Sequence, residues 1–179
     1  MSTFFISDLH LGHAKILEFS REQRQGSNID EHDEWIINSW NSVITKRDLV
    51  WVLGDVVMRQ EHLWKVARLN GRKKLILGNH DLLSSNVYTL YFDEIYGMHK
   101  YKGYWLTHCP IHPSEFRKCR ANIHGHIHNN FITEGKHHKD SRYLNVCVEA
   151  LNGFPISLDE LNKRFKVNNR GEREGGQDE

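Results

Sequence analysis

The residues of this chain that could do chemistry are carboxylate, amide and imidazole side chains grouped in short motifs. In chain order the motifs are Asp8-Leu9-His10, Gly54-Asp55, Gly78-Asn79-His80-Asp81, His108 and Gly125-His126-Ile127-His128. Carboxylate and imidazole groups are ligands that Zn, Mn, Fe and Ni accept. A site built from them indicates metal-assisted chemistry, most often on phosphate.

Each motif has an ordinary structural explanation when it is considered alone. An aspartate after a strand, such as Asp8, Asp55 or Asp81, is commonly a turn residue or a helix cap. His126 and His128 alternate, so on a strand both would simply face the same side. The chemical interpretation therefore depends on all of the motifs coming together in one place.

The motifs follow segments that predict β-strands. Apolar runs predict buried strands at residues 3–7, 49–53 and 74–77, and helical periodicity predicts helices at 30–44 and 61–69 between them. This alternation is typical of a largely parallel sheet. Because ligands bind beyond the carboxyl ends of the strands in such sheets, we expect the following loops to bring the motifs together.

The second half of the chain has a different pattern. It predicts a hairpin over residues 99–107 that turns near Lys102-Gly103, strands at 121–124 and 143–148, and a final helix from Ser157 to about Phe165. Ser157 and Glu160 have the spacing of a capping box for that helix. The polar segment 168–179 predicts a disordered tail, so the expected single domain spans residues 1–167.

Composition narrows the class of protein. A chain of 179 residues with 39% hydrophobic content can form one domain with a real core. A net charge of +1 without a clustered basic face argues against a stable complex with nucleic acid. Three cysteines without CxxC spacing favour reduced thiols and a cytoplasmic protein. The sequence contains neither a signal-peptide pattern nor an apolar run of the ~18 residues that a membrane span needs.

In their order along the chain, the five motifs resemble those of the calcineurin-like metallophosphoesterases, from about residue 4 to residue 165. The opening Ser-Asp-Leu-His-Leu-Gly-His resembles in particular the small stand-alone phosphoesterases of bacteria and their phages. The resemblance implies a four-layer α-β-β-α sandwich in which two mixed β-sheets are flanked by helices. It also implies hydrolysis of a phosphodiester or phosphomonoester by a water that two divalent metal ions activate.

The resemblance further implies a role for each motif. The first metal would be bound by Asp8, His10, Asp55 and His128, and the second by Asp55, Asn79, His108 and His126. His80 would protonate the leaving group, and Asp81 would hydrogen-bond the His80 ring. Nitrogen and oxygen ligands accept Mn, Fe, Zn, Ni or Co, among which we favour Mn.

Two further residues could contact the substrate. His13 lies three positions after His10 and could face the phosphate, support the metal ligands or simply pack. Arg59, four positions after Asp55, could bind a substrate phosphate. The chain is too short for the accessory domains of the large family nucleases, so the expected substrate is a small nucleotide or a short nucleic acid. The alternative function is a non-catalytic scaffold for protein interaction, although relatives of that kind lose ligands that this chain retains.

Overall fold

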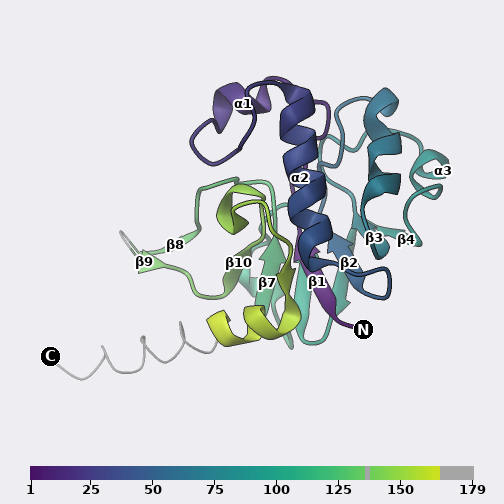
Figure 1. The fold of residues 1–179 in the computed structure, drawn as a ribbon. Coiled ribbons are helices and arrows are strands. Elements are labelled where there is room, and N and C mark those ends of the chain that lie inside the picture. The colour runs from purple at the N-terminus through teal and green to yellow at the C-terminus, as the bar shows by residue number, and fades with distance from the viewer. Residues whose placement is uncertain (136–137, 166–179) are drawn as a thin grey trace, which may run out of the picture.

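Two mixed β-sheets form the centre of the protein (Figure 1). The computed structural model describes residues 1–135 and 138–165. One sheet has the strand order β11-β1-β2-β3-β4 and the other the order β10-β7-β6-β5. The first sheet comprises β1 (Thr3–Ile6), β2 (Leu49–Val52), β3 (Arg72–Ile76), β4 (Glu94–Tyr96) and β11 (Ile156–Ser157). The second comprises β5 (Met98–Tyr101), β6 (Tyr104–Thr107), β7 (Ala121–His124) and β10 (Tyr143–Asn145). A small separate hairpin pairs β8 (Thr133–Glu134) with β9 (His138–Lys139).

The first sheet is parallel from β1 to β4, and β11 runs antiparallel along its edge. All residues of β2 are buried, as expected for a central strand covered on both faces. The parallel strands end at the same edge of the sheet, and therefore the loops that follow them are neighbours. This is the arrangement that the alternating apolar and helical segments predict.

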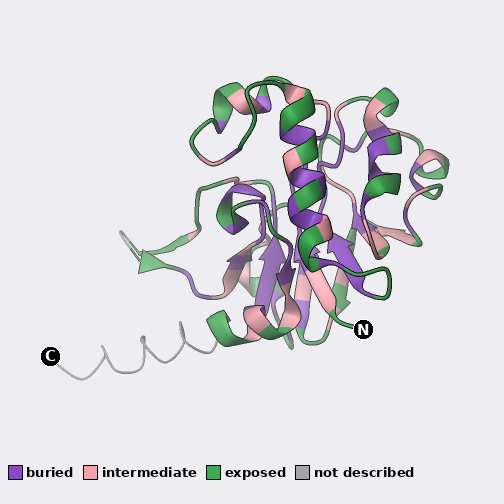
Figure 2. Cartoon of the chain, viewed as in Figure 1, coloured by how far each residue is buried: buried purple, intermediate pink, exposed green. Residues whose placement is uncertain are grey.

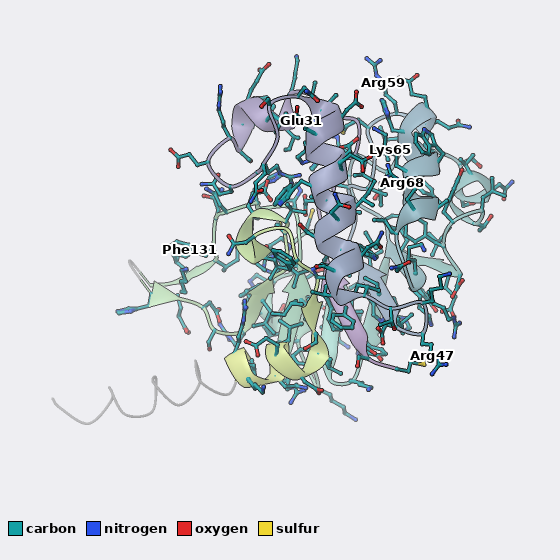
Figure 3. The ribbon with its side chains drawn as sticks, viewed as in Figure 1. Glu31, Arg47, Arg59, Lys65, Arg68 and Phe131 are labelled. Atoms are coloured by element: carbon teal, nitrogen blue, oxygen red, sulfur yellow. The ribbon has the colours of Figure 1, made fainter. Side chains whose placement is uncertain are left out.

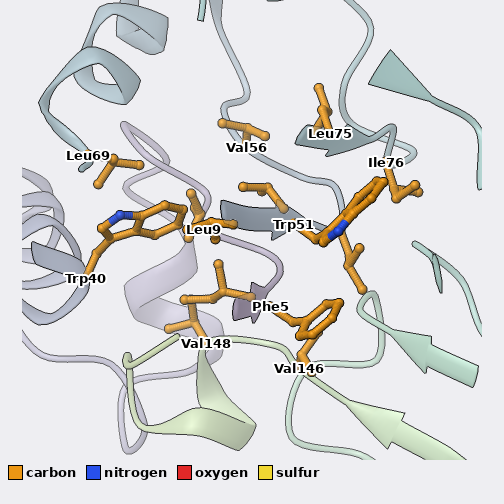
Figure 4. Packing of buried hydrophobic residues seen from close by; sticks show 14 of the residues in the cluster. Phe5, Leu9, Trp40, Trp51, Val56, Leu69, Leu75, Ile76, Val146 and Val148 are labelled. Carbon is orange, nitrogen blue, oxygen red and sulfur yellow. The ribbon is translucent and has the colours of Figure 1, made fainter. Parts of the chain in front are cut away.

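The two sheets pack face to face through aromatic side chains. The ring of Trp51 on β2 lies 5.0 Å from the His99 ring and 5.5 Å from the Tyr101 ring, both on β5 of the other sheet. The Phe5 ring on β1 lies 6.2 Å from the Tyr101 ring. Figure 4 shows Phe5 and Trp51 in this core together with Val146, which follows β10. The buried side chains thus join both sheets into one core.

Helices cover the outer face of the first sheet. Helix α2 (Ile29–Val43) lies across it, and its buried residues face the strands while its other side is exposed (Figures 1 and 2). Ile36 and Trp40 are fully buried on that face. The predicted helix at residues 61–69 forms as the 3-10 helix η1 (Gln60–Arg68), with Leu63 and Val66 in the core. The shorter helical segments are α1 (Ile16–Phe19), α3 (Ser85–Tyr88), η2 (Pro113–Glu115) and η3 (Glu149–Leu151).

The final helix, residues 158–165, packs on the second sheet. The Tyr104 hydroxyl on β6 donates to Asn162 Oδ1 over 2.7 Å, and the Tyr104 and Phe165 rings lie 6.3 Å apart. Ser157 Oγ accepts from the Glu160 amide over 3.1 Å, as the capping box predicts. Helices therefore lie outside both mixed sheets, and the predicted α-β-β-α fold class is confirmed.

The hairpin predicted over 99–107 is present as β5 and β6, which turn at residues 102–103. The predicted tail at 168–179 lies outside the described residues, and the domain limit at residue 167 stays a prediction. All three cysteines are free. Among the described helices, none combines the length and the apolar character that crossing a membrane requires.

Candidate metal centre

Hydrogen bonds hold the loops after β1 and β2 side by side. The Asp8 amide donates to the Gly54 carbonyl, and the His10 amide donates to the Asp55 carbonyl, each over 3.0 Å. The loop after β7 joins them, because the His126 amide donates to Asp8 Oδ2 over 2.9 Å. Residues far apart in the sequence therefore meet at one edge of the sheets.

The backbone of these loops adopts an unusual conformation. Left-handed φ angles occur at Asp8 (59°), His10 (50°), Asp55 (54°), His126 (72°) and His128 (52°). Among the described residues these are five of the eight non-glycine residues with a positive φ. Such conformations cost free energy in residues that carry a Cβ, and they cluster at functional sites where the surroundings enforce them. The fold thus holds predicted metal ligands in strained positions.

Asp8, His10 and His128 form the first group of potential ligands, with one ligand atom from each within 4.8 Å of the others. His10 Nε2 lies 3.7 Å from Asp8 Oδ1 and 3.7 Å from Asp55 Oδ2. The His10 and His128 rings stack with their centroids 5.5 Å apart. These are four of the residues that the sequence predicts, and they form one small cluster.

The hydrogen bonds of Asp8 test whether this cluster fits a cation. Its Oδ2 accepts from Ser7 Oγ (2.6 Å), the His126 amide (2.9 Å) and Cys147 Sγ (3.2 Å). Its Oδ1 is buried and has no hydrogen-bond partner, and the same is true of His10 Nε2. Buried polar atoms without partners are costly and uncommon. A divalent ion would satisfy both atoms, so the residues fit a metal.

Asn79, His108 and His126 form the second group. Asn79 Oδ1 lies 2.9 Å from His108 Nε2 and 2.9 Å from His126 Nδ1, and these two nitrogens are 3.2 Å apart. On its other side, His108 Nδ1 lies 2.7 Å from the Leu53 carbonyl, to which it donates. In the neutral ring this leaves the Nε2 lone pair directed at the cluster, as in metal-binding histidines.

Asp55 connects the two groups. Its Oδ2 lies 3.4 Å from His108 Nε2 in the second group as well as 3.7 Å from His10 Nε2 in the first. Burial alone would raise the pKa of Asp55, but hydrogen bonding to His108 and the charge of that ring outweigh it and lower the pKa. Burial likewise opposes ionisation of Asp8, yet its interactions with His10 and His108 hold its pKa well below the usual range. Both side chains are therefore carboxylates at neutral pH.

His80 lies at the open side of this cluster. Its side chain is exposed, its ring centroid is 5.9 Å from that of His10, and its amide donates to Asp55 Oδ1 over 2.9 Å. In the described part of the chain, Asp81 does not form the expected hydrogen bond with the His80 ring. Asp81 instead accepts from the amides of Gly78 (2.8 Å), Asp55 (2.8 Å) and Val56 (3.0 Å). The carboxylate of Asp81 thus ties the loop after β2 to the loop after β3.

The two predicted substrate residues differ in their placement. The His13 ring lies 5.5 Å from that of His10, and its Nδ1 is buried without a hydrogen-bond partner. Burial and the nearby charge of His10 lower the pKa of His13, which favours the neutral ring. Arg59 lies at the outer end of η1, where its exposed guanidinium is 3.8 Å from Glu61 (Figure 3). The structure thus brings His13 to the metal centre and leaves the Arg59 side chain exposed.

Two buried residues that the motifs did not indicate support the centre. Glu149 Oε1 accepts from His128 Nδ1 over 2.9 Å and from Arg24 Nε over 2.8 Å, and both side chains of this ion pair are fully buried. Arg24 also donates to the carbonyls of Asp8 (2.6 Å) and Leu9 (3.2 Å). The pair therefore links the first and last ligand loops. A carboxylate next to the apolar run 146–148 is the sequence signal that could have identified Glu149.

Cys109 also lies near the second group, with its sulfur within 4.8 Å of ligand atoms of His108 and His126. Burial and the nearby Asp55 charge raise the pKa of its thiol, which favours the protonated form. A protonated thiol is a poor metal ligand. The geometry places Cys109 beside the centre without making it part of the predicted ligand set.

Comparisons with known proteins agree with this geometry. Residues 1–163 match the family model of the calcineurin-like phosphoesterases. An uncharacterised protein of Methanocaldococcus jannaschii is 33% identical over 163 residues, which cover 87% of this chain and 86% of that protein. The Gene 66 protein of Mycobacterium phage L5 is 31% identical over 198 residues, covering 89% and 92% of the two chains. The crystal structure of a protein of unknown function from Aquifex aeolicus aligns with a TM-score of 0.71 at 28% identity, covering 90% of this chain and 98% of that one.

Proposed function

The chain belongs to the calcineurin-like phosphoesterase family, and we propose that its metal centre hydrolyses phosphate esters with two divalent ions. The observation that carries this proposal is the position of Asp55. One oxygen of its carboxylate lies within 3.7 Å of a histidine nitrogen in each ligand group. A single carboxylate between two sets of nitrogen and oxygen ligands is suited to hold two ions close together.

In this proposal each ligand group would hold one ion, and Asp55 would be shared. Asp8, His10, Asp55 and His128 would hold the first ion, and Asp55, Asn79, His108 and His126 would hold the second. We favour Mn among the divalent ions that such ligands accept. When bound, the ions would polarise the phosphate and lower the pKa of a water at the centre.

The side chains around the ions would orient the ester and move a proton. His80 is exposed at the cluster, and we propose that its ring donates a proton to the leaving oxygen as the ester bond breaks. The His80 amide donates to Asp55 Oδ1, and this hydrogen bond fixes the backbone of His80 relative to the Asp55 carboxylate. The neutral ring favoured at His13 can donate one hydrogen bond to a phosphate oxygen. Arg59, whose exposed side chain lies 3.8 Å from Glu61, stays a candidate contact for a substrate phosphate.

The proposed substrates are phosphodiesters or phosphomonoesters of nucleotide type, including short nucleic acids. The balanced net charge of +1 supports a small substrate rather than a stably bound long polyanion. The free thiols of all three cysteines support a reducing compartment, and we place the protein in the cytoplasm.

An activity panel tests the proposal. Purified protein supplied with Mn²⁺ is assayed on 4-nitrophenyl phosphate, bis(4-nitrophenyl) phosphate, a cyclic nucleotide and a short single-stranded DNA. We expect hydrolysis of at least one ester, loss of activity with chelator, and no activity in Asp55→Asn. If the protein binds Mn²⁺ stoichiometrically and hydrolyses none of the four, the enzymatic proposal is wrong and a scaffold role replaces it.

A further inference from the structure

A groove of 380 Å³ begins at two residues of the second ligand group, Asn79 and His108. Its other walls include Leu77, Met98 and Ile111. Its size lies near the lower end of the ~300–1,000 Å³ that small-ligand pockets usually occupy. None of the residues that line it is an Asp, Glu, Lys or Arg. A group held in this groove would be within reach of a phosphate at the metal centre.

The groove lies where the two sheets meet. Leu77 follows β3 of the first sheet, Met98 begins β5 of the second sheet, and Ile111 follows β6. Hydrogen bonds fix two of these walls, at Leu77 and at Ile111. The Leu77 amide donates to the Tyr96 carbonyl over 2.8 Å. The Ile111 amide donates to Asn122 Oδ1 over 3.1 Å, and its carbonyl accepts from the Tyr143 hydroxyl over 2.6 Å. These hydrogen bonds hold the backbone of both walls in place.

We propose that this groove binds the organic group of the phosphate ester, and that it selects an uncharged ring. The inference rests on the proposed function, because the ester phosphate must lie on the metal centre for its organic group to enter the groove. Burial of an apolar ring against Leu77, Met98 and Ile111 is favourable. A charged group would lose water there and meet no oppositely charged side chain in the lining. A nucleobase and a simple aryl ring share the required chemistry.

Gly97 offers a way to fill the groove without touching a metal ligand. Gly97 lines the groove and is exposed, and a Cβ built on it meets no atom within 4 Å. Its φ lies outside the left-handed range, so a larger side chain is compatible with the backbone. Gly97→Leu should occupy part of the space that the ring would use. Ser42→Leu adds the same side chain to an exposed position of α2 and serves as the matched control.

The experiment measures binding by calorimetry to Mn-loaded protein that carries His80→Ala, so that the two monoester probes are not hydrolysed during the titration. Phenylphosphonate and methylphosphonate form one probe pair, and thymidine 5′-monophosphate and 2-deoxyribose 5-phosphate form the second. We expect the ring-bearing ligand of each pair to bind about tenfold tighter, a preference of the size that an apolar pocket provides. Gly97→Leu should abolish the preference, and Ser42→Leu should keep it. A preference in only one pair identifies which kind of ring the groove selects.

Equal affinity within both pairs, or a preference that survives Gly97→Leu, would overturn the inference while the phosphoesterase proposal stands. If no probe binds although the activity panel shows hydrolysis, the groove inference fails and the phosphoesterase proposal stands. A second measurement does not depend on the variant. In Zn-loaded protein labelled at the methionine methyl groups, phenylphosphonate should shift the NMR signal of Met98, whereas methylphosphonate should not. Of the three methionines, Met1 and Met58 lie outside the lining and provide internal references. An unshifted Met98 signal with bound phenylphosphonate would also overturn the inference.

Discussion

Asp55 and His80 make different contacts in the candidate metal centre, and we propose different roles for them. Asp55 directs one carboxylate oxygen toward both ligand groups and uses the other to accept from the His80 amide. The His80 ring, by contrast, is exposed and is not part of either group. Binding of metal should therefore depend on Asp55, and proton transfer should depend on His80.

The variants His80→Ala and Asp55→Asn test this separation. We expect His80→Ala to keep its metal content and to lose turnover by about 100-fold or more, because a general acid contributes that much. Asp55→Asn should lose metal and activity together, because a neutral amide cannot serve as a shared anionic ligand. Metal analysis and kcat on an ester with a poor leaving group provide the measurement. Full turnover in His80→Ala on that ester would show that another group donates the proton.

Glu149 determines the orientation of His128. It accepts from His128 Nδ1, which in the neutral ring leaves Nε2 free for a metal. Burial alone would raise the pKa of Glu149, but the hydrogen bond from His128 and the charge of Arg24 lower it to about 2. The side chain is therefore ionised at neutral pH, where it holds both partners.

We expect Glu149→Gln to weaken Mn²⁺ binding by about 10- to 100-fold, the usual effect of removing a partner of a ligating histidine. The free energy of unfolding should also fall, by about 3–5 kcal/mol, because Arg24 keeps a buried charge without its counter-ion. Calorimetric titration and urea unfolding measure the two effects. Glu160→Gln, at a partly exposed position of the final helix, is the control and should change neither. Unchanged Mn²⁺ affinity in Glu149→Gln would exclude the positioning role.

The candidate ligand residues stand out in the sequence because they occur in motifs, whereas the buried pair that supports them leaves only a weak signal, a carboxylate next to the apolar run 146–148. Arg24 and Glu149 are 125 positions apart, and no local spacing connects them. The partner of Asp81 was predicted wrongly for a related reason. Its adjacency to His80 in the sequence suggested a contact, but three backbone amides from two loops compete for the same carboxylate.

At the scale of secondary-structure elements, the strands and the loops that follow them explain the site. The apolar runs predicted β1, β2 and β3, because β2 is buried throughout and β1 and β3 each end in two buried residues. Strand β4 was not predicted, since Glu94-Ile95-Tyr96 is short and only partly buried. Strand β11 was missed because its Ser157 also caps the final helix, and the capping signal dominated.

Close approach between loops requires glycine at position 125. A Cβ on Gly125 would lie 2.0 Å from Ser7 Oγ and 2.5 Å from Asp8 Oδ2. We expect Gly125→Ala to push the last ligand loop away from Asp8, to lower the free energy of unfolding by about 1–3 kcal/mol, and to weaken Mn²⁺ binding. Gly97→Ala is the matched control, because its Cβ meets no atom within 4 Å. Thermal unfolding and Mn²⁺ titration of both variants measure the difference. Equal behaviour of the two variants would show that the loops can separate without loss.

At the scale of the whole molecule, the metal centre joins loops from both sheets. Asp8 and Asp55 follow strands of the first sheet, whereas His108 and His126 follow strands of the second. A bound ion would therefore link the two sheets at the edge where the ligands meet. Any ligand that binds the folded state alone stabilises that state by mass action. Metal binding should consequently be visible in the stability of the complete protein.

We expect saturating Mn²⁺ to raise the melting temperature of the metal-free protein. At a metal concentration of 100 times the Kd, one site adds about 2.7 kcal/mol, which for a chain of this size corresponds to a rise of about 5–10 °C. Differential scanning calorimetry after chelation and after reloading measures the change. Asp55→Asn should show a much smaller rise, because it loses the carboxylate shared between the ligand groups. Asn28→Ala, which removes the cap at the start of α2 and does not change a predicted ligand, should melt lower in both states yet keep the full rise. A full rise in Asp55→Asn would mean that the stabilising metal binds elsewhere. A site that depends on the carboxylate shared by both ligand groups could not stabilise this variant to the same extent.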